Sequence, residues 1–179
     1  MLLLYFLISA VWVFVTALPM LLVNSTDASE LAGTFAARGM LAKVLAIGGG
    51  ALYATGMLVE AVADGQKSAF RRVPENKEKF ITHGLWAWSR HPNYAGEIIL
   101  WWGAFLTAAS ALPLPASVAA SACPFFIHFL LTRVSGVPLL EASAKKRWGD
   151  DAEYKAYKKR TPCLWPTLAS VLGGVKPST

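Results

Sequence analysis

The chain has 179 residues, enough for one domain, and its 17 Lys and Arg against 11 Asp and Glu give a net charge of +6. Only 16% of the residues are charged and 55% are hydrophobic, whereas an average soluble domain has about 25% charged residues. Together with a mean hydropathy of +0.43, this composition excludes a disordered chain, a collagen-like repeat and an ordinary cytosolic enzyme. We therefore expect an all-α, polytopic membrane helical bundle in which residues 1–179 form a single membrane domain.

Four apolar segments predict about four transmembrane helices, because a helix needs roughly 20 apolar residues to cross the bilayer core. The predicted spans cover residues 2–23, 41–62, 93–111 and 114–133, and a polar connector follows the first of them at 24–39. The first segment lacks the basic start and the small-residue cleavage site of a signal peptide, so we expect it to be retained. The last two spans come from one apolar block that Leu112-Pro113-Leu114-Pro115 interrupts.

Two short helices are expected after the last span, at about residues 138–148 and 151–160, lying on the membrane surface. Glu141 and Lys145 are four residues apart and can form an ion pair on the first of these helices. Asp150 or Asp151 is placed to cap the second.

The basic residues predict the orientation of the chain. Residues 63–95 and the tail after residue 139 hold 14 of the 17 Lys and Arg, and four spans place both segments on one side of the membrane. By the positive-inside rule that side is cytosolic or its organelle equivalent. We expect an integral protein of the endoplasmic reticulum, an organelle or a bacterial inner membrane.

The segment around residue 90 contains the first candidate site. Pro92 follows His91, and proline is common at the first position of a helix. The start of a helix offers free N–H groups and a partial positive charge. Together with Arg90, this arrangement can bind a phosphate or a carboxylate. Asn93, Tyr94 and Glu97 follow where the chain enters the membrane, and an ionisable group there indicates function. A helix cap with interfacial side chains would explain Arg90, but not Asn93 and Glu97.

A second candidate site continues the second predicted span. Glu60, Asp64, Lys67 and Arg71 follow one another at spacings of four, three and four, so they share one helical face. Two acids followed by bases suit a ligand with a polar ring at one end and phosphates at the other. A solvated helix end with internal salt bridges would explain the bases, but not Glu60 inside the apolar run.

A third candidate group combines Glu141 with Tyr154 and Tyr157 of the tail. By spacing alone this region is only the end of a span followed by an interfacial helix.

No metal site is expected, because the three histidines show no ligand spacing. The two cysteines, Cys123 and Cys163, lie forty residues apart without a CxxC motif, so no disulfide is predicted.

The three candidate segments and the tail resemble the steroid 5α-reductase superfamily (3-oxo-5-alpha-steroid 4-dehydrogenase C-terminal-like proteins). The likeness is strongest to a branch of this superfamily that consists of uncharacterised membrane proteins, DUF1295. The resemblance rests on three blocks in the same order, residues 60–67, 84–97 and 133–141, and on the tail from Trp148 to Pro166. It covers nearly all of the chain from about Val11 to Pro166. The block from Arg90 to Glu97 is fairly specific.

The resemblance implies a membrane-embedded oxidoreductase that uses NADPH to reduce a C=C bond conjugated to a carbonyl in a steroid or another lipid. Lys67, Arg71 and Arg72 would suit the 2′-phosphate of this cofactor. No catalytic residue is identified. With the residue-based candidates, the expected cofactor-binding set is Glu60, Asp64, Lys67, Arg71, Arg90, His91, Asn93, Tyr94, Glu97, Glu141, Tyr154 and Tyr157.

Two alternatives remain open. Isoprenylcysteine carboxyl methyltransferases share the general fold and a similar Arg-His-Pro-x-Tyr stretch, and they use S-adenosylmethionine. A non-catalytic membrane subunit that keeps the scaffold is the other alternative.

Reductases of the superfamily carry further helices before the region of likeness. Three explanations stay open: a partner membrane subunit supplies the substrate half, the sequence is a fragment of a longer one, or the protein no longer catalyses. In each case we expect no enone reduction by this chain alone. The other expected partners are the lipid bilayer and a lipid or steroid-like substrate, and no nucleic acid.

Overall fold

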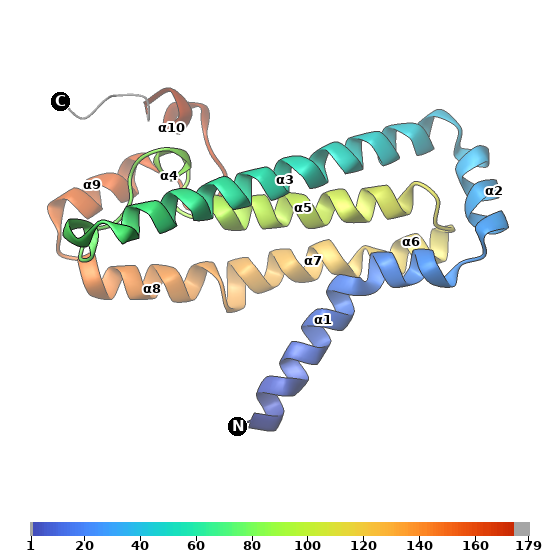
Figure 1. Ribbon diagram of the computed structural model, residues 1–179, viewed down its shortest axis with the longest axis horizontal. Coiled ribbons are helices and arrows are strands. Elements are labelled where there is room, and N and C mark those ends of the chain that lie inside the picture. Colours follow the sequence, from blue (N-terminus) through green and yellow to red (C-terminus); the bar gives the residue numbers. More distant parts are fainter. Residues whose placement is uncertain (1, 174–179) are drawn as a thin grey trace. The chain divides into compact units, whose positions relative to one another are not determined.

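The structure, a computed structural model, describes residues 2–173, except for the side chains of residues 2–5 and 8. No β-strand occurs in this range, which confirms the all-α fold class. The α-helices are α1 (Leu2–Ser25), α2 (Ala28–Arg38), α3 (Met40–Arg72), α4 (Leu85–Trp88), α5 (Pro92–Ala109), α6 (Leu114–Ala120), α7 (Ala122–Phe129), α8 (Val137–Trp148), α9 (Ala152–Arg160) and α10 (Leu168–Gly173) (Figure 1). A short 3-10 helix, η1 (Pro74–Asn76), and a π-helix, η2 (Leu130–Val134), complete the order.

Two helical stretches of the described chain are long and apolar enough to cross a membrane, Met40–Arg72 and Leu114–Trp148. A third crossing is added if the bent pair Ser9–Ser25 and Ala28–Arg38 counts as one span. Helix α5 covers the third predicted span but is not among these stretches. Helix length and composition therefore support two or three crossings, against about four expected, and they indicate an integral membrane protein.

The polar connector expected at 24–39 is largely the helix α2. Glu30 in its first turn and Arg38 in its last turn complement the helix dipole. The chain bends by 98° between Ser9–Ser25 and α2, and it turns again at Gly39, which has a φ of 54° that favours glycine.

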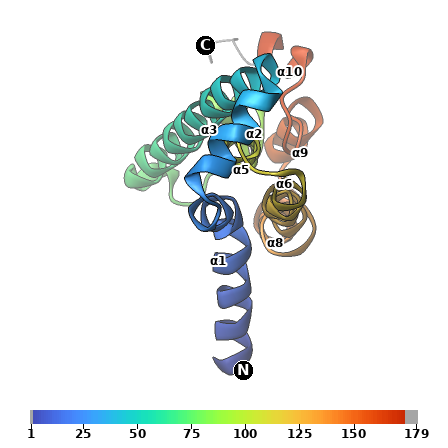
Figure 2. The same ribbon diagram turned by 90° about the vertical axis from the view of Figure 1, so that its right-hand side faces the viewer.

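The chain divides into two compact units. The first comprises Met1–Thr55 and Ile98–Leu130. Here α1 packs against α6 and α7, as Figures 1 and 2 show for α6. The α3 and α5 segments of this unit touch at glycines, because a Cβ on Gly103 would overlap the backbone of Gly49 and Tyr53. Small residues of this kind allow close helix packing inside a membrane.

The second unit comprises Gly56–Glu97 and Leu131–Thr179. Its α3 and α5 segments also pack closely, since a Cβ on Gly96 would lie 2.7 Å from the Glu60 backbone nitrogen. Ala63, Ile81 and Trp86 form a buried core here. Helix α10 packs against α4 and α9, and the Ser170 hydroxyl donates a hydrogen bond to the Trp88 carbonyl.

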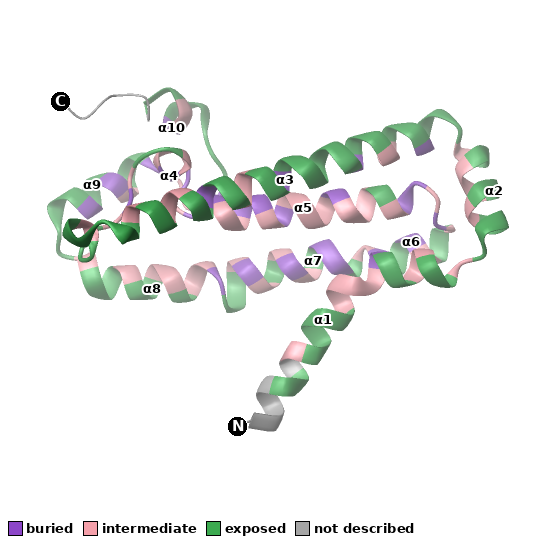
Figure 3. Ribbon diagram, viewed as in Figure 1, coloured by how far each residue is buried: buried purple, intermediate pink, exposed green. Residues whose placement is uncertain are grey.

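The apolar helices leave many large side chains uncovered. Val13 on α1 is 65% exposed and Ile47 on α3 is 74% exposed, and Figure 3 shows exposed residues along most of α3. Such surfaces would be costly in water, and they fit helices that face lipid.

Candidate functional site

A cavity lies within the second unit, and several segments of that unit form its wall. Helices α3, α4, α8 and α9 contribute, together with the loop between α3 and α4 and the residues just before α5. The lining residues are Lys67, Phe70, Arg71, Lys79, Phe80, Ile81, Trp86, Arg90, His91, Leu140, Glu141, Ser143, Ala144, Arg147, Trp148, Tyr154 and Tyr157.

The cavity is strongly cationic. Five of its lining side chains are Lys or Arg, namely Lys67, Arg71, Lys79, Arg90 and Arg147, and one, Glu141, is acidic. Six are aromatic: Phe70, Phe80, Trp86, Trp148, Tyr154 and Tyr157. Bases among aromatic rings suit a ligand that carries both negative charge and flat rings.

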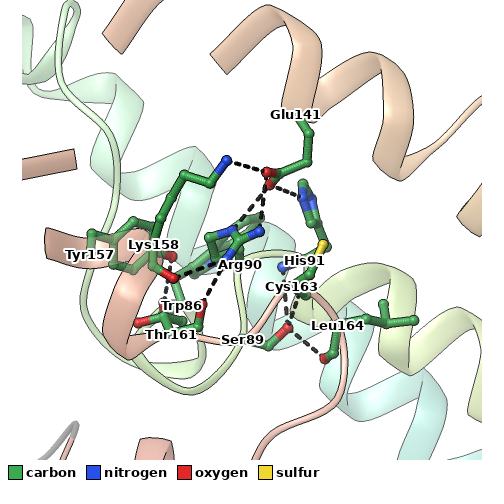
Figure 4. Close-up of polar contacts among 10 residues, drawn as sticks. All are labelled: Trp86, Ser89, Arg90, His91, Glu141, Tyr157, Lys158, Thr161, Cys163 and Leu164. Carbon is green, nitrogen blue, oxygen red and sulfur yellow. Dashed lines mark hydrogen bonds and ion pairs between the residues drawn. The ribbon is translucent and has the colours of Figure 1, made fainter. Parts of the chain in front are cut away.

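Glu141 is the centre of an ion-pair network that we name the Glu141 cluster, consisting of Glu141, Arg90, His91 and Lys158 (Figure 4). Arg90 binds the carboxylate in a bidentate manner, Nε to Oε1 and Nη2 to Oε2, both at 3.1 Å. Nε2 of His91 lies 2.9 Å from Oε1, and Nζ of Lys158 lies 3.1 Å from Oε2. The carboxylate therefore neutralises part of the positive charge on the cavity wall.

Arg90 is held at both its backbone and its side chain. Its backbone N–H donates to the Pro162 carbonyl, and Nη1 donates to the Thr161 carbonyl at 2.8 Å. Burial alone would lower the pKa of Arg90, but the hydrogen bonds and negative charge of Glu141 raise it. Arg90 is therefore a fixed cation that organises the wall, and most of its donors are already used.

The turn before α5 is held by a buried serine. The Ser89 hydroxyl donates to the Leu164 carbonyl at 2.7 Å and accepts a hydrogen bond from the His91 backbone N–H (Figure 4). Pro92 then opens α5, as expected for a residue that needs no N–H partner at a helix start. This local order places Arg90 and His91 beside the cavity.

The ion pair expected between Glu141 and Lys145 is replaced by longer-range partners. The carboxylate meets Arg90, His91 and Lys158 instead, which lie in other segments of the second unit. Buried hydrogen-bonded partners outweigh an exposed pair along one helix, which contributes only about 0.2–0.5 kcal/mol. Asp151, by contrast, caps α9 as expected, and its side chain accepts from the Glu153 and Tyr154 backbone N–H groups.

Aromatic rings form another part of the wall. Phe80 contacts the rings of Trp148, Tyr154 and Tyr157 at centroid distances of 5.6, 5.0 and 5.6 Å. The Tyr157 hydroxyl donates to the Trp86 carbonyl at 2.7 Å, and burial raises the pKa of Tyr157 above its ordinary value. Burial also raises the pKa of Tyr154, so both phenols are proton-bearing at neutral pH.

Seven of the twelve residues predicted for cofactor binding line the cavity: Lys67, Arg71, Arg90, His91, Glu141, Tyr154 and Tyr157. The remaining five are not among the lining residues: Glu60, Asp64, Asn93, Tyr94 and Glu97. Tyr94 stacks on the His91 ring at 5.9 Å. Glu60 lies where α3 meets Gly96 of α5, and Asp64 is exposed. On this face of α3 the bases Lys67 and Arg71 therefore line the cavity, whereas the acids Glu60 and Asp64 do not.

Several residues of the cavity wall were not predicted as site residues from the sequence, among them Lys79, Phe80, Trp86 and Arg147. Arg147 donates to the Lys77 carbonyl and pairs with Glu78, which fastens α8 to the loop between α3 and α4. The basic run around Arg147 was visible in the sequence, but only as an orientation signal. Phe80 had no distinguishing pattern, since its partners come from α8 and α9.

His91, Glu141 and Cys163 offer three metal-ligand atoms within 4.8 Å of one another, a group that the spacing of the histidines did not reveal. However, Arg90 and Lys158 already contact the carboxylate. A divalent cation would add to this positive charge. The arrangement is therefore better explained as an ion-pair network than as a metal centre.

No curated protein and no solved structure matches the chain. A family model described as "Protein of unknown function (DUF1295)" matches residues 1–161. The match includes the whole loop between α3 and α4, the turn at Arg90 and all of α9. The chain therefore belongs to the DUF1295 family.

Proposed function

We propose that the chain is a membrane-embedded, NADPH-dependent reductase of the steroid 5α-reductase type. Its substrate is a lipid or steroid with a C=C bond conjugated to a carbonyl. The observation that carries this proposal is the cationic, aromatic cavity of the second unit. Lys67, Arg71 and Lys79 line it outside the Glu141 cluster.

The charge of the cavity favours NADPH over S-adenosylmethionine. NADPH carries a pyrophosphate and a 2′-phosphate, each of which lysine and arginine bind through charge-assisted hydrogen bonds. S-adenosylmethionine has no phosphate and carries a sulfonium cation, which five basic side chains would repel. This difference in charge between the two cofactors supports the proposed reductase over the methyltransferase alternative.

Two buried polar atoms at the start of α5 have no partner within the described part of the chain. They are Nδ1 of His91 and Oδ1 of Asn93. A buried polar group without a partner costs about 1–3 kcal/mol, so such atoms are rare unless a ligand or water completes them.

When bound, NADPH supplies a hydride for the β-carbon of the enone. In our proposal the residues of the chain hold and orient the cofactor. Lys67, Arg71 and Lys79 bind its phosphates, the aromatic wall covers its rings, and the Glu141 cluster keeps the wall rigid. The apolar helices bring a lipid substrate to this side of the membrane.

The proposal is tested by equilibrium dialysis of the purified full chain in detergent or nanodiscs against NADPH and S-adenosylmethionine. We expect NADPH to bind at least tenfold more tightly. Tighter binding of S-adenosylmethionine would support the methyltransferase alternative, and binding of neither would support the non-catalytic subunit. Because we expect no enone reduction by this chain alone, enone-dependent oxidation of NADPH is then measured in membranes that retain its partners, with a panel of conjugated enone lipids.

A further inference from the structure

We propose that the segment around α10 is a docking surface for the anionic headgroup layer of a phospholipid bilayer. The proposal concerns a surface outside the cavity and does not depend on the reductase function. The surface has an apolar part on and just before α10 and a basic part at the end of α9. We name it the tail patch, consisting of Lys159, Arg160, Trp165, Leu168 and Leu172.

The apolar part of the tail patch is exposed although it belongs to no helix that can cross a membrane. Trp165 is 45% exposed, and Leu168 and Leu172 are 76% and 71% exposed. The exposed apolar side chains of α1 and α3 lie on stretches that can cross a membrane, but the last such stretch ends at Trp148. Large apolar side chains that remain exposed outside a crossing helix indicate an interaction surface.

Helix α10 is held in an orientation that turns its two leucines outward. The buried Ser170 donates a hydrogen bond to the Trp88 carbonyl of α4 at 2.9 Å. Thr167 and Ser170 also exchange backbone-to-side-chain hydrogen bonds of 3.0 and 3.2 Å, which close the first turn. With about 100° per residue, Leu168 and Leu172 each lie roughly 160° around the helix axis from Ser170. The leucines therefore form the face of α10 opposite to α4.

The basic part of the tail patch complements an anionic headgroup. Residues 154–173 contain four basic residues and no acidic one, and Lys159 and Arg160 among them are exposed. Five positions separate Arg160 from Trp165, and an extended chain of that length spans at most about 18 Å. The bases and the tryptophan can therefore reach the same small area of a membrane interface. Tryptophan is enriched at such interfaces, and lysine and arginine are attracted to anionic lipids there.

A bilayer is favoured over a protein partner as the occupant of the tail patch. The α3 segment of the same unit belongs to a stretch that can cross a membrane, and its Met57, Leu58 and Val62 are exposed. A membrane therefore lies beside this unit. Apolar side chains next to bases are typical of segments that lie in the plane of an anionic membrane surface.

Docking of the tail patch would fix the turn that carries Arg90 relative to the membrane surface. The Pro162 carbonyl accepts from the Arg90 backbone N–H at 3.0 Å, and the Leu164 carbonyl accepts from the Ser89 hydroxyl at 2.7 Å. Both acceptors lie between the basic and the apolar part of the tail patch. The segment that docks is thus bonded directly to the turn beside the cavity.

The experiment measures the depth of a nitroxide spin label at Leu172→Cys, in the full chain without Cys123 and Cys163. The chain is reconstituted in nanodiscs of phosphatidylcholine, with or without phosphatidylserine. Oxygen concentrates in the bilayer and a charged nickel complex stays in water, so their collision rates with the label report its depth. We expect oxygen collisions to dominate in the anionic nanodiscs. A label at Glu153→Cys, an exposed acidic position of α9, is the control and should stay accessible to the nickel complex.

The contribution of charge is tested by Lys159→Gln combined with Arg160→Gln. In the anionic nanodiscs the ratio of docked to undocked label should fall about fivefold for each base removed. Lys145→Gln combined with Lys146→Gln removes the same charge from exposed positions of α8 and should change this ratio far less.

A label at Leu172 that stays accessible to the nickel complex in anionic nanodiscs would overturn the proposal, as would equal docking with and without phosphatidylserine. Protection of the label only in native membranes, and not in nanodiscs, would show that a protein covers the tail patch, which also overturns it. Leu168→Cys provides a second label position if circular dichroism shows that Leu172→Cys is misfolded. A negative result at both positions leaves the proposed cofactor binding untouched, because that is measured separately by dialysis.

Discussion

The guanidinium of Arg90 and the carboxylate of Glu141 meet through two parallel hydrogen bonds of 3.1 Å across a sequence separation of 51 positions. The side chains are 12% and 20% exposed, so the pair is mostly withdrawn from water. Removal of one partner from such a pair leaves a charge without compensation. We therefore expect the Glu141 cluster to stabilise the second unit.

Glu141→Gln should lower the free energy of unfolding by about 3 kcal/mol, because Arg90, whose side chain is 12% exposed, would remain beside a neutral amide. Circular dichroism during unfolding in mixed micelles measures the change. Glu78→Gln is the matched control, since it removes the Arg147–Glu78 pair, whose side chains are 44% and 79% exposed. An exposed pair contributes at most about 1 kcal/mol. Similar effects of both substitutions would contradict the role given to the Glu141 cluster.

Arg71→Ala should weaken NADPH binding by roughly tenfold, because a charge-assisted hydrogen bond to phosphate is lost. NADH should be affected far less if Arg71 binds the 2′-phosphate, which NADH lacks. Arg72→Ala is the control, because Arg72 neighbours Arg71 but is not a lining residue. An equal loss of affinity for NADPH and NADH would mean that Arg71 contacts a part of the cofactor other than the 2′-phosphate.

Gly96→Ala should destabilise the chain by about 1–3 kcal/mol, because the added methyl group would lie 2.7 Å from the Glu60 nitrogen and 2.8 Å from the Gly56 carbonyl oxygen. Those are backbone atoms, which cannot move aside without separating α3 from α5. Gly65→Ala is the control, since nothing lies within 4 Å of a Cβ there. It should be neutral or stabilising by up to about 1 kcal/mol, through helix propensity. Both variants are compared with the wild type in the same unfolding experiment. An unchanged free energy of unfolding in Gly96→Ala would contradict the close packing of α3 on α5.

Tyr157 should make stability decline in alkaline solution. Burial raises its pKa in the folded chain, so the stabilising, proton-bearing form is complete below the unfolded value of about 10 and is lost as the pH rises above it. Tyr157→Phe should therefore flatten the alkaline part of the stability curve. It should also cost about 1 kcal/mol at neutral pH, where the bond to the Trp86 carbonyl is lost. An unchanged alkaline slope would show that other groups control it.

Membrane sidedness is predicted from the basic residues. Single cysteines at Ser68 and Ser29, in a background without Cys123 and Cys163, should be labelled from opposite sides of the membrane. Ser68 is an exposed residue of α3, so its substitution should disturb the fold little. Labelling of both positions from one side would refute the predicted topology.

Local patterns were sufficient for much of the fold. Runs of apolar residues located the long helices, and Asp151 and Pro92 marked the starts of α9 and α5. Helix α2 was missed because its residues are polar enough to suggest a connector. Its acidic first turn and basic last turn were the available signals.

The site was only partly predictable, for a physical reason. Lys67 and Arg71 share a helix, so spacing could place them together, and both line the cavity. The partners of Glu141 come from other segments of the second unit, and no local rule identifies them. The same holds for Phe80, whose ring contacts depend on the folding of its loop against α8 and α9.

The ammonium of Lys67 lies 4.9 Å from the centroid of the Trp86 indole ring. A positive charge held over an indole perturbs its excited state, so the emission of Trp86 depends on where Lys67 is. A phosphate that draws Lys67 toward itself would change that emission, and a reduced nicotinamide nearby would accept energy from the excited ring. The wall of the cavity thus contains its own optical reporter, and Trp86→Phe identifies its contribution among the seven tryptophans of the chain.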